Sequence, residues 1–344
     1  MTLPLRLSMA LAATLISGWA AAAVQSFSPP YASIGSIERL DPALDRLIPP
    51  DARIEKLADG FHWSEGPVWL RREKALLFSD VPENTIYRWS AEKGITVFLK
   101  PSGWTGDPAQ TREGSNGLTL DAEDRLVLAQ HGDRRVARLA PGSDGFSTLV
   151  ERYDGKRFNS PNDLCFDRAG RIYFTDPPYG LPKGVEPELG FCGVYRLDTN
   201  GTVTLITREL ERPNGVALSP DQRTLYVANS HPPRPIIWVI PLSEDGTPGK
   251  GRVFFDASSL MKKDRPGIPD GMKIDTEGNL WATGPGGVLV ISPEGKHLGT
   301  LLTGRSTANC AFGEDGSTLF LTADSMLLRL KTRVQGEPVG KRLK

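Results

Sequence analysis

The chain has 344 residues, and its 41 Lys and Arg residues balance its 41 Asp and Glu residues, so the formal net charge at pH 7 is zero. A balanced charge argues against a nucleic-acid-binding surface, and we expect no nucleic-acid partner. With the N-terminal segment set aside, about 320 residues remain, which is enough for a large hydrophobic core.

The N-terminal segment has the pattern of a secretory signal peptide. Arg6 precedes the apolar run LSMALAATLISGWA, and small residues follow at positions 21–23. This run is too short for a stable membrane span. We therefore expect a signal peptide at 1–23, an N-terminal arm at 24–49, and a periplasmic or secreted protein without membrane contact after cleavage. An uncleaved membrane anchor is the alternative.

Six segments of the remaining chain repeat one pattern. Each begins with Asn, Asp or Glu, continues as a short apolar strand, turns through polar residues and ends in a second apolar strand, which predicts a β-hairpin. The six are EGPVWLRREKALLFSD from residue 65, NGLTLDAEDRLVLAQ from 116, NDLCFDRAGRIYFTD from 162, NGVALSPDQRTLYVAN from 214, DGMKIDTEGNLWATG from 270 and NCAFGEDGSTLFLTA from 309.

A third strand follows every hairpin, and a fourth strand follows the first five. Four short strands per unit, at a period of about 40 to 50 residues, predict an all-β fold, a six-bladed β-propeller that occupies residues 50–344 as a single domain. The sixth unit lacks its fourth strand. We expect the segment RIEKLA at 53–58 to supply it and to close the ring. A β-sandwich is the alternative, but six aligned hairpins argue against it.

Long connections are predicted to meet at one end of the propeller, here called the upper face. In a four-stranded blade, the first strand begins on the face where the second strand ends, and segments 100–115, 176–192, 229–235 and 256–269 all fall there. Long loops on one face of a rigid scaffold are where function concentrates. The first residue of each repeat also lies at this face, so the following side chains should surround the central channel: Glu65, Asn116, Asn162, Asn214, Asp270 and Asn309.

This ring of oxygen-bearing side chains predicts a cation site. Two carboxylates that converge on one axis would repel each other unless a cation lay between them, and oxygen ligands favour a hard divalent cation, above all Ca²⁺. Mg²⁺, Mn²⁺ and Zn²⁺ are the alternatives, although the four His residues lack the usual zinc-binding spacing. Asn116 and Asn309 could instead cap turns. Glu is a poor turn residue, so Glu65 is the clearer indication.

The sequence favours neither a serine hydrolase nor a disulfide. No G-x-S-x-G motif occurs, so a serine hydrolase lacks its usual signature. The three cysteines, Cys165, Cys192 and Cys310, allow at most one internal disulfide, and we favour buried free thiols.

Several motifs resemble one known family. The segments EGPVW, SPNDL, RPNGVALSPD and IPDGM are similar to motifs of the gluconolactonase, regucalcin (senescence marker protein) and luciferin-regenerating family, and of its bacterial gluconolactonases most closely. The resemblance implies a six-bladed propeller with a divalent metal in the central channel. It implies metal ligands at Glu65, Asn214 and Asp270, with Asn162 either binding the metal or facing the substrate. It also implies Asp270 as the general acid/base.

Together these features lead us to expect a lactonase, a hydrolase of carboxylic esters that opens a sugar lactone such as gluconolactone to the aldonic acid. The cation would polarise the lactone carbonyl, while Asp270 takes a proton from water and returns it to the ring oxygen. His131 is the alternative base. Asn116, His131, Asn162 and Asp176 are expected to contact this small-molecule substrate. An organophosphatase with the same metal site, a non-catalytic ligand-binding propeller and a strictosidine-synthase-like activity are the alternatives.

Overall fold

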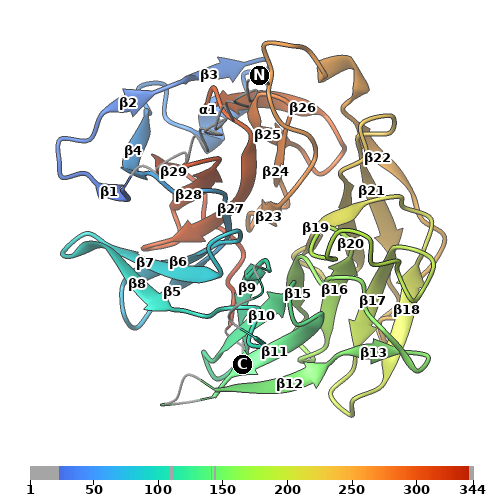
Figure 1. Ribbon diagram of the computed structural model, residues 1–344. Coiled ribbons are helices and arrows are strands. Elements are labelled where there is room, and N and C mark those ends of the chain that lie inside the picture. The colour runs from blue at the N-terminus through green and yellow to red at the C-terminus, as the bar shows by residue number, and fades with distance from the viewer. Residues whose placement is uncertain (1–22, 108–109, 111, 141, 143–144, 341–344) are drawn as a thin grey trace, which may run out of the picture.

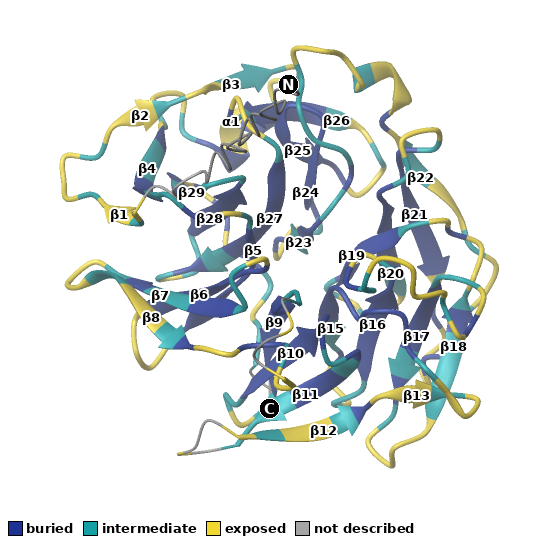
Figure 2. Ribbon diagram, in the orientation of Figure 1, coloured by how far each residue is buried: buried dark blue, intermediate teal, exposed yellow. Residues whose placement is uncertain are grey.

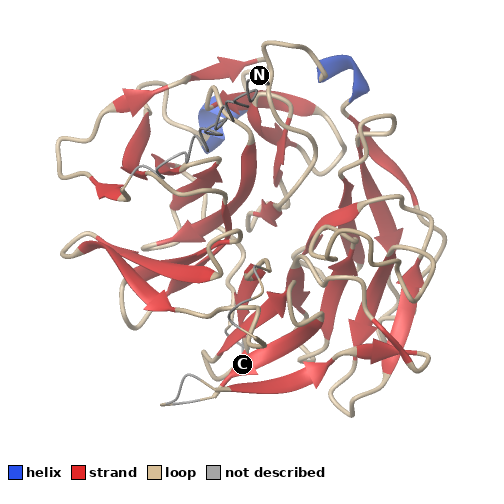
Figure 3. Ribbon diagram, viewed as in Figure 1, coloured by secondary structure: helices blue, strands red, loops and turns tan. Residues whose placement is uncertain are grey.

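Antiparallel sheets are arranged around a central axis in the computed structural model, and strands make up nearly all of its regular structure (Figures 1 and 3). The structure describes residues 23–340 apart from 108–109, 111, 141 and 143–144. The predicted signal peptide lies outside these residues except for its last position and stays a prediction. Six sheets form the blades, which confirms the predicted six-bladed β-propeller.

The first four blades each hold four strands in chain order from the axis outward. Blade 1 contains β5 (Ser64–Leu70), β6 (Ala75–Asp80), β7 (Thr85–Ser90) and β8 (Gly94–Leu99). Blade 2 contains β9 (Ser115–Leu120), β10 (Leu126–Gln130), β11 (Arg135–Leu139) and β12 (Phe146–Val150). Blade 3 contains β15 (Leu164–Phe166), β16 (Ile172–Asp176), β17 (Gly193–Leu197) and β18 (Val203–Thr207). Blade 4 contains β19 (Pro213–Leu218), β20 (Thr224–Asn229), β21 (Ile236–Pro241) and β22 (Arg252–Asp256).

The last two blades use strands from both ends of the chain. Blade 5 contains β23 (Met272–Ile274), β24 (Leu280–Gly284), β25 (Gly287–Ile291) and β26 (His297–Leu302). Blade 6 contains β27 (Thr307–Gly313), β28 (Thr318–Ala323) and β29 (Met326–Lys331), and its fourth strand is β4 (Ile54–Asp59). β4 pairs with β29. The predicted closure of the ring by the N-terminal strand is therefore confirmed.

The N-terminal arm contributes more than an extended connection. Its strand β3 (Ser36–Arg39) pairs with β26 at the outer edge of blade 5, and β1 (Gln25–Ser26) and β2 (Ser33–Ile34) both pair with β4. The short helix α1 (Leu44–Leu47) buries Leu44 and Leu47 against the core between blades 5 and 6. The arm thus covers sheet edges that would otherwise be unpaired.

Small elements outside the blades complete the described structure. A two-stranded ribbon, β13 (Arg152–Tyr153) with β14 (Lys156–Arg157), connects blades 2 and 3, and η1 (Ser258–Leu260) is a single 3₁₀ turn. Within the described residues, no helix has the length and apolarity needed to cross a membrane. Cys165, Cys192 and Cys310 are all free thiols, as we favoured, but only Cys310 is buried, whereas Cys165 and Cys192 are partly exposed.

The hydrophobic core consists of six clusters, and each cluster lies between two neighbouring blades. Between blades 6 and 1, for example, Trp69 stacks on Phe320 with ring centroids 5.4 Å apart. Buried residues run along the inner and middle strands of each blade (Figure 2). Because each sheet is buried on both faces, the inner strands are held rigidly around the channel.

The turns between first and second strands lie at the lower face, and buried Asp residues close three of them. Asp167 accepts hydrogen bonds from the backbone N–H of Ala169 and of Arg171, and it pairs with the Arg171 guanidinium. Asp121 and Asp275 occupy the same position in blades 2 and 5 and bond their own turns in the same way. These carboxylates therefore have a structural role as turn caps.

Candidate active site

The six predicted ring residues lie where the inner strands begin, at irregular points of the ladder. In blades 1 and 4, the pairing register shifts between Glu65 and Val68 and between Pro213 and Val216. In blades 3 and 5, regular pairing starts only after the ring residues Asn162 and Asp270. Such bulges redirect side chains and are common beside active sites. Here they occur at the position from which a side chain can reach the axis.

Hydrogen bonds join the ring residues, or the strands that carry them, around the channel. The Glu65 carboxylate accepts a hydrogen bond from Asn309 Nδ2 at 3.5 Å. The backbone N–H of Gly117, next to Asn116, donates to the Asn162 carbonyl at 2.8 Å. Thr175 Oγ1 donates to the Asn214 carbonyl at 2.7 Å, and the Thr175 carbonyl accepts from the N–H of Asn162. A Cβ on Gly215, next to Asn214, would lie 2.2 Å from the Asp270 carbonyl oxygen. The structure therefore brings the beginnings of all six inner strands together around the channel.

Glycine after the ring residue makes this close approach sterically feasible. Gly66 has φ +50°, and a Cβ on it would lie 2.1 Å from the Asn116 carbonyl oxygen. A Cβ on Gly271 would lie 2.0 Å from the Asn309 side chain. Only glycine avoids both the strain and the overlap at position 66. Gly66 thus allows the chain beside Glu65 to approach Asn116 closely.

Several ring oxygens are buried and have no hydrogen-bond partner among the described residues. They are Asn116 Oδ1, Asn162 Oδ1 and Asp270 Oδ1. Buried polar atoms are nearly always hydrogen-bonded, and each one left unsatisfied costs about 1–3 kcal/mol. Three such oxygens at one end of one channel indicate a site for a group that is not part of the chain.

The carboxylates at this site are held in an unfavourable environment for negative charge. Burial raises the pKa of Glu65 to about 7, and repulsion from Asp163 adds to the effect, while the N–H of Gly66 opposes it. Burial, followed by repulsion from Glu65 and Asp163, raises the pKa of Asp270 well above its ordinary value. Mutual repulsion of this kind is relieved when a cation binds between the carboxylates.

The third carboxylate, Asp163, was not predicted from the sequence. It follows Asn162 at the position where four of the other five repeats have glycine, and that exception is the signal that could have found it. Asp163 Oδ2 is buried without a partner among the described residues. Burial raises the pKa of Asp163, whereas Lys273 lowers it. Lys273, whose charge lowers the pKa of Asp163, was likewise not predicted from the sequence.

His131 lies on the upper face with a carboxylate beside it. Its Nδ1 is 3.1 Å from Glu113 Oε2, its ring is almost completely buried, and its Nε2 has no partner among the described residues. A Cβ on Gly180 would lie 2.6 Å from the His131 Cβ and 3.0 Å from that of Ser160, so His131 and Ser160 both pack against the loop that follows β16. An imidazole oriented by a carboxylate is suited to accept a proton.

Tyr179 in the loop after β16 is a further residue at the site that the sequence did not single out. Its hydroxyl approaches the Ser230 carbonyl at 3.4 Å. Ser230 Oγ donates to the carbonyl of Pro269, the residue before Asp270, so Ser230 connects Tyr179 to this part of the ring. Tyr179 therefore borders the ring from an upper loop.

Asp176 is placed differently from the other predicted substrate ligands. It is completely buried, and its two oxygens accept hydrogen bonds at 2.8 Å from the N–H groups of Asn159 and Ser160. Burial raises its pKa to about 7, against the effect of these bonds and of Arg134. These contacts hold the loop that leads to Asn162, and its contact with substrate stays a prediction.

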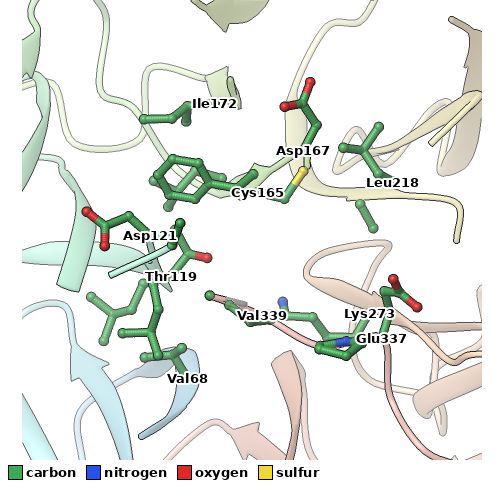
Figure 4. Close-up of a pocket in the computed structure, with 18 of the residues that line it drawn as sticks. Val68, Thr119, Asp121, Cys165, Asp167, Ile172, Leu218, Lys273, Glu337 and Val339 are labelled. Atoms are coloured by element: carbon green, nitrogen blue, oxygen red, sulfur yellow. The ribbon is translucent and has the colours of Figure 1, made fainter. Parts of the chain in front are cut away.

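The lower half of the channel holds a cavity of about 460 Å³. It is lined by the far ends of the inner strands and by the C-terminal segment, including Glu337 and Val339. Figure 4 shows Lys273 on one wall, beside Val339 and Glu337 and opposite Cys165 and Asp167. None of the six ring residues lines this cavity, so it is distinct from the candidate site.

The ring residues fit a hard divalent cation by their chemistry. Glu65, Asn162, Asn214 and Asp270 offer two carboxylates and two amide oxygens, and two of the unpartnered oxygens belong to this set. Oxygen donors of this kind suit Ca²⁺. Among the described residues, no group of three or more His, Cys, Asp or Glu side chains is arranged to hold a metal ion. Two of the four predicted ligands, Asn162 and Asn214, are Asn residues, and a group defined by His, Cys, Asp and Glu leaves them out.

Comparisons with known proteins give one consistent result. The family model "SMP-30/Gluconolactonase/LRE-like region" matches residues 63–325. A gluconolactonase of Zymomonas mobilis is 41% identical over 334 residues, which cover 94% of this chain and 93% of that protein. A solved gluconolactonase from Xanthomonas campestris superposes with a TM-score of 0.78 at 33% identity, over 89% of this chain and 98% of its own. A calcium-binding regucalcin from Agrobacterium tumefaciens shares the fold with a TM-score of 0.67 at 18% identity, over 91% and 98%.

Proposed function

The chain belongs to the SMP-30/gluconolactonase/LRE-like family, and on this premise we propose that it is a lactonase that hydrolyses a sugar lactone such as gluconolactone to the aldonic acid. The similarity to gluconolactonases extends over nearly the whole chain, and the family match at residues 63–325 contains all six ring positions. The observation that carries the proposal is the set of buried, unpartnered oxygens of Asn116, Asn162 and Asp270 at the mouth of the channel.

We propose Glu65, Asn162, Asn214 and Asp270 as the ligands of a divalent cation, with Ca²⁺ as the first candidate. The raised pKa values of Glu65 and Asp270 support this assignment, because a cation would stabilise both ionised carboxylates. Bound there, the cation would supply Lewis-acid polarisation of the lactone carbonyl. The solved regucalcin described as calcium-binding has the same fold, which agrees with this choice of metal.

The chain's own residues would move the proton. In the proposed reaction, a water oxygen attacks the lactone carbonyl carbon while Asp270 Oδ1 takes a proton from that water. When the ring C–O bond breaks, the same proton passes to the departing ring oxygen, so one water is consumed and one hydroxy acid forms. Burial keeps bulk water away from Asp270 Oδ1, and a bound cation would keep Asp270 in the ionised form that accepts the proton.

His131 is the second candidate for the base. Glu113 holds Nδ1 and leaves Nε2 as the free nitrogen. We further propose that Asn116, Asn162 and Tyr179 contact the substrate hydroxyls from around the ring. Export to the periplasm or outside the cell remains part of the proposal on the basis of the N-terminal sequence.

Hydrolysis of a lactone panel, with and without a chelator, tests this function. We expect glucono-δ-lactone or a related sugar lactone to be opened, the rate to fall to background on chelation, and Ca²⁺ to restore it. Asp270→Asn and His131→Ala, each with its calcium content measured, identify the base. Full hydrolysis after verified removal of the metal would exclude the proposed role of the cation, and hydrolysis of an organophosphate but of no lactone would favour the alternative substrate class.

A further inference from the structure

The cavity in the lower half of the channel is surrounded by one inner-strand side chain from each blade. These side chains occupy the third position after each ring residue, and all six line the cavity: Val68, Thr119, Cys165, Ala217, Lys273 and Phe312. Five of them are uncharged, and Lys273 is the exception. Figure 4 shows Lys273 beside Val339 and opposite Cys165. A single positive charge is therefore set in a wall that is otherwise uncharged at this level.

The cavity has the size and the apolar lining of a small-molecule site. Its volume of about 460 Å³ falls within the range of roughly 300–1,000 Å³ that is typical of such sites. The C-terminal segment forms part of the wall, because the N–H of Glu337 donates to the Ile274 carbonyl at 2.9 Å and Val339 packs against the core between blades 1 and 2. Further apolar lining comes from Leu118, Leu164 and Val216.

All six carboxylates among the described residues of the lining form ion pairs. Asp121 pairs with Arg125 at 2.7 Å and with Arg138 at 2.9 Å. The other five are Glu123 with Arg125, Asp167 with Arg171, Asp198 with Arg196, Glu314 with Arg329 and Glu337 with Arg168. Two lining cations, Lys273 and Arg71, form no ion pair within the described part of the chain. The charge that the lining leaves unpaired is therefore positive.

The Lys273 ammonium can accept one more partner. It has three N–H donors, and two of them have uncharged acceptors, the Met272 carbonyl at 3.0 Å and Asn309 Oδ1 at 3.3 Å. The third donor has no partner in the described structure, and the side chain is partly exposed on the cavity wall. A carboxylate oxygen there would complete the hydrogen bonds and balance the charge. A doubly charged phosphate would bring a second charge that a single ammonium does not compensate.

We propose that the lower cavity is a second ligand site, which binds an aliphatic monocarboxylate with its carboxylate on Lys273 Nζ and its hydrocarbon chain against the apolar wall. Arg71, in the exposed lower turn of blade 1, adds positive charge at the solvent side and favours the approach of an anion. The ligand is bound noncovalently and meets none of the six ring residues. The inference is therefore independent of the proposed cation and of lactone hydrolysis.

Calorimetric titration of the chelator-treated protein with three probes of equal chain length tests the site: decanoate, decan-1-ol and decylamine, each below its micellar concentration. We expect wild type to bind one decanoate per chain, decan-1-ol roughly tenfold more weakly, and decylamine not at all. Lys273→Met should weaken decanoate binding about 10- to 100-fold and leave decan-1-ol unchanged. Lys250→Met, at an exposed lysine outside the cavity, is the matched control and should bind all three probes like wild type.

Val339→Trp gives a second test that keeps the charge of Lys273. The larger side chain should fill the cavity and abolish the binding of decanoate and decan-1-ol alike, while the melting temperature verifies that each variant is folded. Decanoate binding that is unchanged in both Lys273→Met and Val339→Trp would overturn the proposal. Equal binding of decanoate and decylamine by wild type, or binding of no probe, would overturn it as well. Because no lactone and no Ca²⁺ are present, these results are separate from the test of the proposed function.

Discussion

Buried carboxylates lie at both ends of the channel, and they differ in how their oxygens are used. At the lower face, Asp167 and Asp275 accept hydrogen bonds on both oxygens from their own turns and neighbours. At the upper face, Asp270 Oδ1 is buried with no partner in the described structure. The same residue type therefore closes a turn at one end and leaves an open oxygen at the other, where the long loops meet.

This difference is informative because the open arrangement is unfavourable for folding. An unsatisfied buried polar atom costs about 1–3 kcal/mol, so a ring that contains three of them is not explained by stability. Active sites often retain such features at the expense of stability. We therefore interpret the lower carboxylates as structural residues and the upper ring as a functional site.

The largest effect is expected from Asp270→Asn. Loss of the proposed base should lower kcat by about 10² to 10⁴-fold, the usual range for general acid/base groups. The same substitution should raise the melting temperature of the cation-free protein, because it removes a buried carboxylate that Glu65 and Asp163 repel. Lactone hydrolysis and thermal unfolding check the two effects. A variant that loses stability as well as activity would make Asp270 resemble the lower carboxylates.

Glu65→Gln should act mainly on the cation. Removing one of two ligand charges is expected to weaken Ca²⁺ binding roughly tenfold or more. The measurement is the rise in melting temperature on addition of Ca²⁺, since a ligand that binds only the folded state stabilises it. Glu337→Gln, the same change at the lower face where Glu337 pairs with Arg168, is the matched control and should respond to Ca²⁺ like wild type.

Asp167→Ala should show the opposite pattern. Its turn would lose two backbone hydrogen bonds and the Arg171 pair, so we expect a loss of about 1–3 kcal/mol in the free energy of unfolding, with kcat unchanged. Urea denaturation and a lactonase assay at a temperature where the variant is folded check this. Glu92→Ala, at an exposed turn of blade 1, is the control. A fall in kcat without a loss of stability would contradict the structural role of Asp167.

The smallest effect concerns pH and the carboxylate that belongs to neither set. Asp176 lies at the upper face but bonds the N–H groups of Asn159 and Ser160. Its pKa in the folded protein, about 7, is above its ordinary value, so the folded state holds this proton more tightly than the unfolded state. Its contribution to stability is therefore greatest at low pH and declines as the pH rises from about 4 to about 7.

Asp176→Asn should flatten that decline without removing it, because Glu65 has a raised pKa as well. The free energy of unfolding at pH 5 and pH 8, measured for both proteins without divalent cation, gives the difference in slope. An unchanged slope in Asp176→Asn would show that Asp176 ionises at its ordinary pKa.

The blades could be predicted from the sequence because the repeated pattern identifies their inner strands. Six hairpins in register, with one missing outer strand, led to the closure by β4, which the structure confirms. The pairing of β3 with β26 was not predicted. β3 has four residues, Ser36–Arg39, and no alternation of apolar and polar side chains strong enough to distinguish an edge strand from an extended arm.

The ring residues were predictable for the same reason, whereas the charged residues that surround them were not. Glu65 and Asp270 occupy a repeated position, so the repeat identifies them. Asp163 and Lys273 depart from the repeat, and their importance follows only from burial and from contacts across blades. Glu113 reaches His131 from 18 positions away, through a loop whose path the sequence does not specify.

Calcium titration of the chelator-treated protein by calorimetry, with wild type, Asp167→Ala and Asp270→Asn compared, is the direct test of the cation site. The account predicts one Ca²⁺ per chain in wild type and in Asp167→Ala, and strongly weakened binding in Asp270→Asn. Equal binding in wild type and Asp270→Asn, or a loss of binding in Asp167→Ala alone, would contradict the assignment of the open oxygens to a cation site.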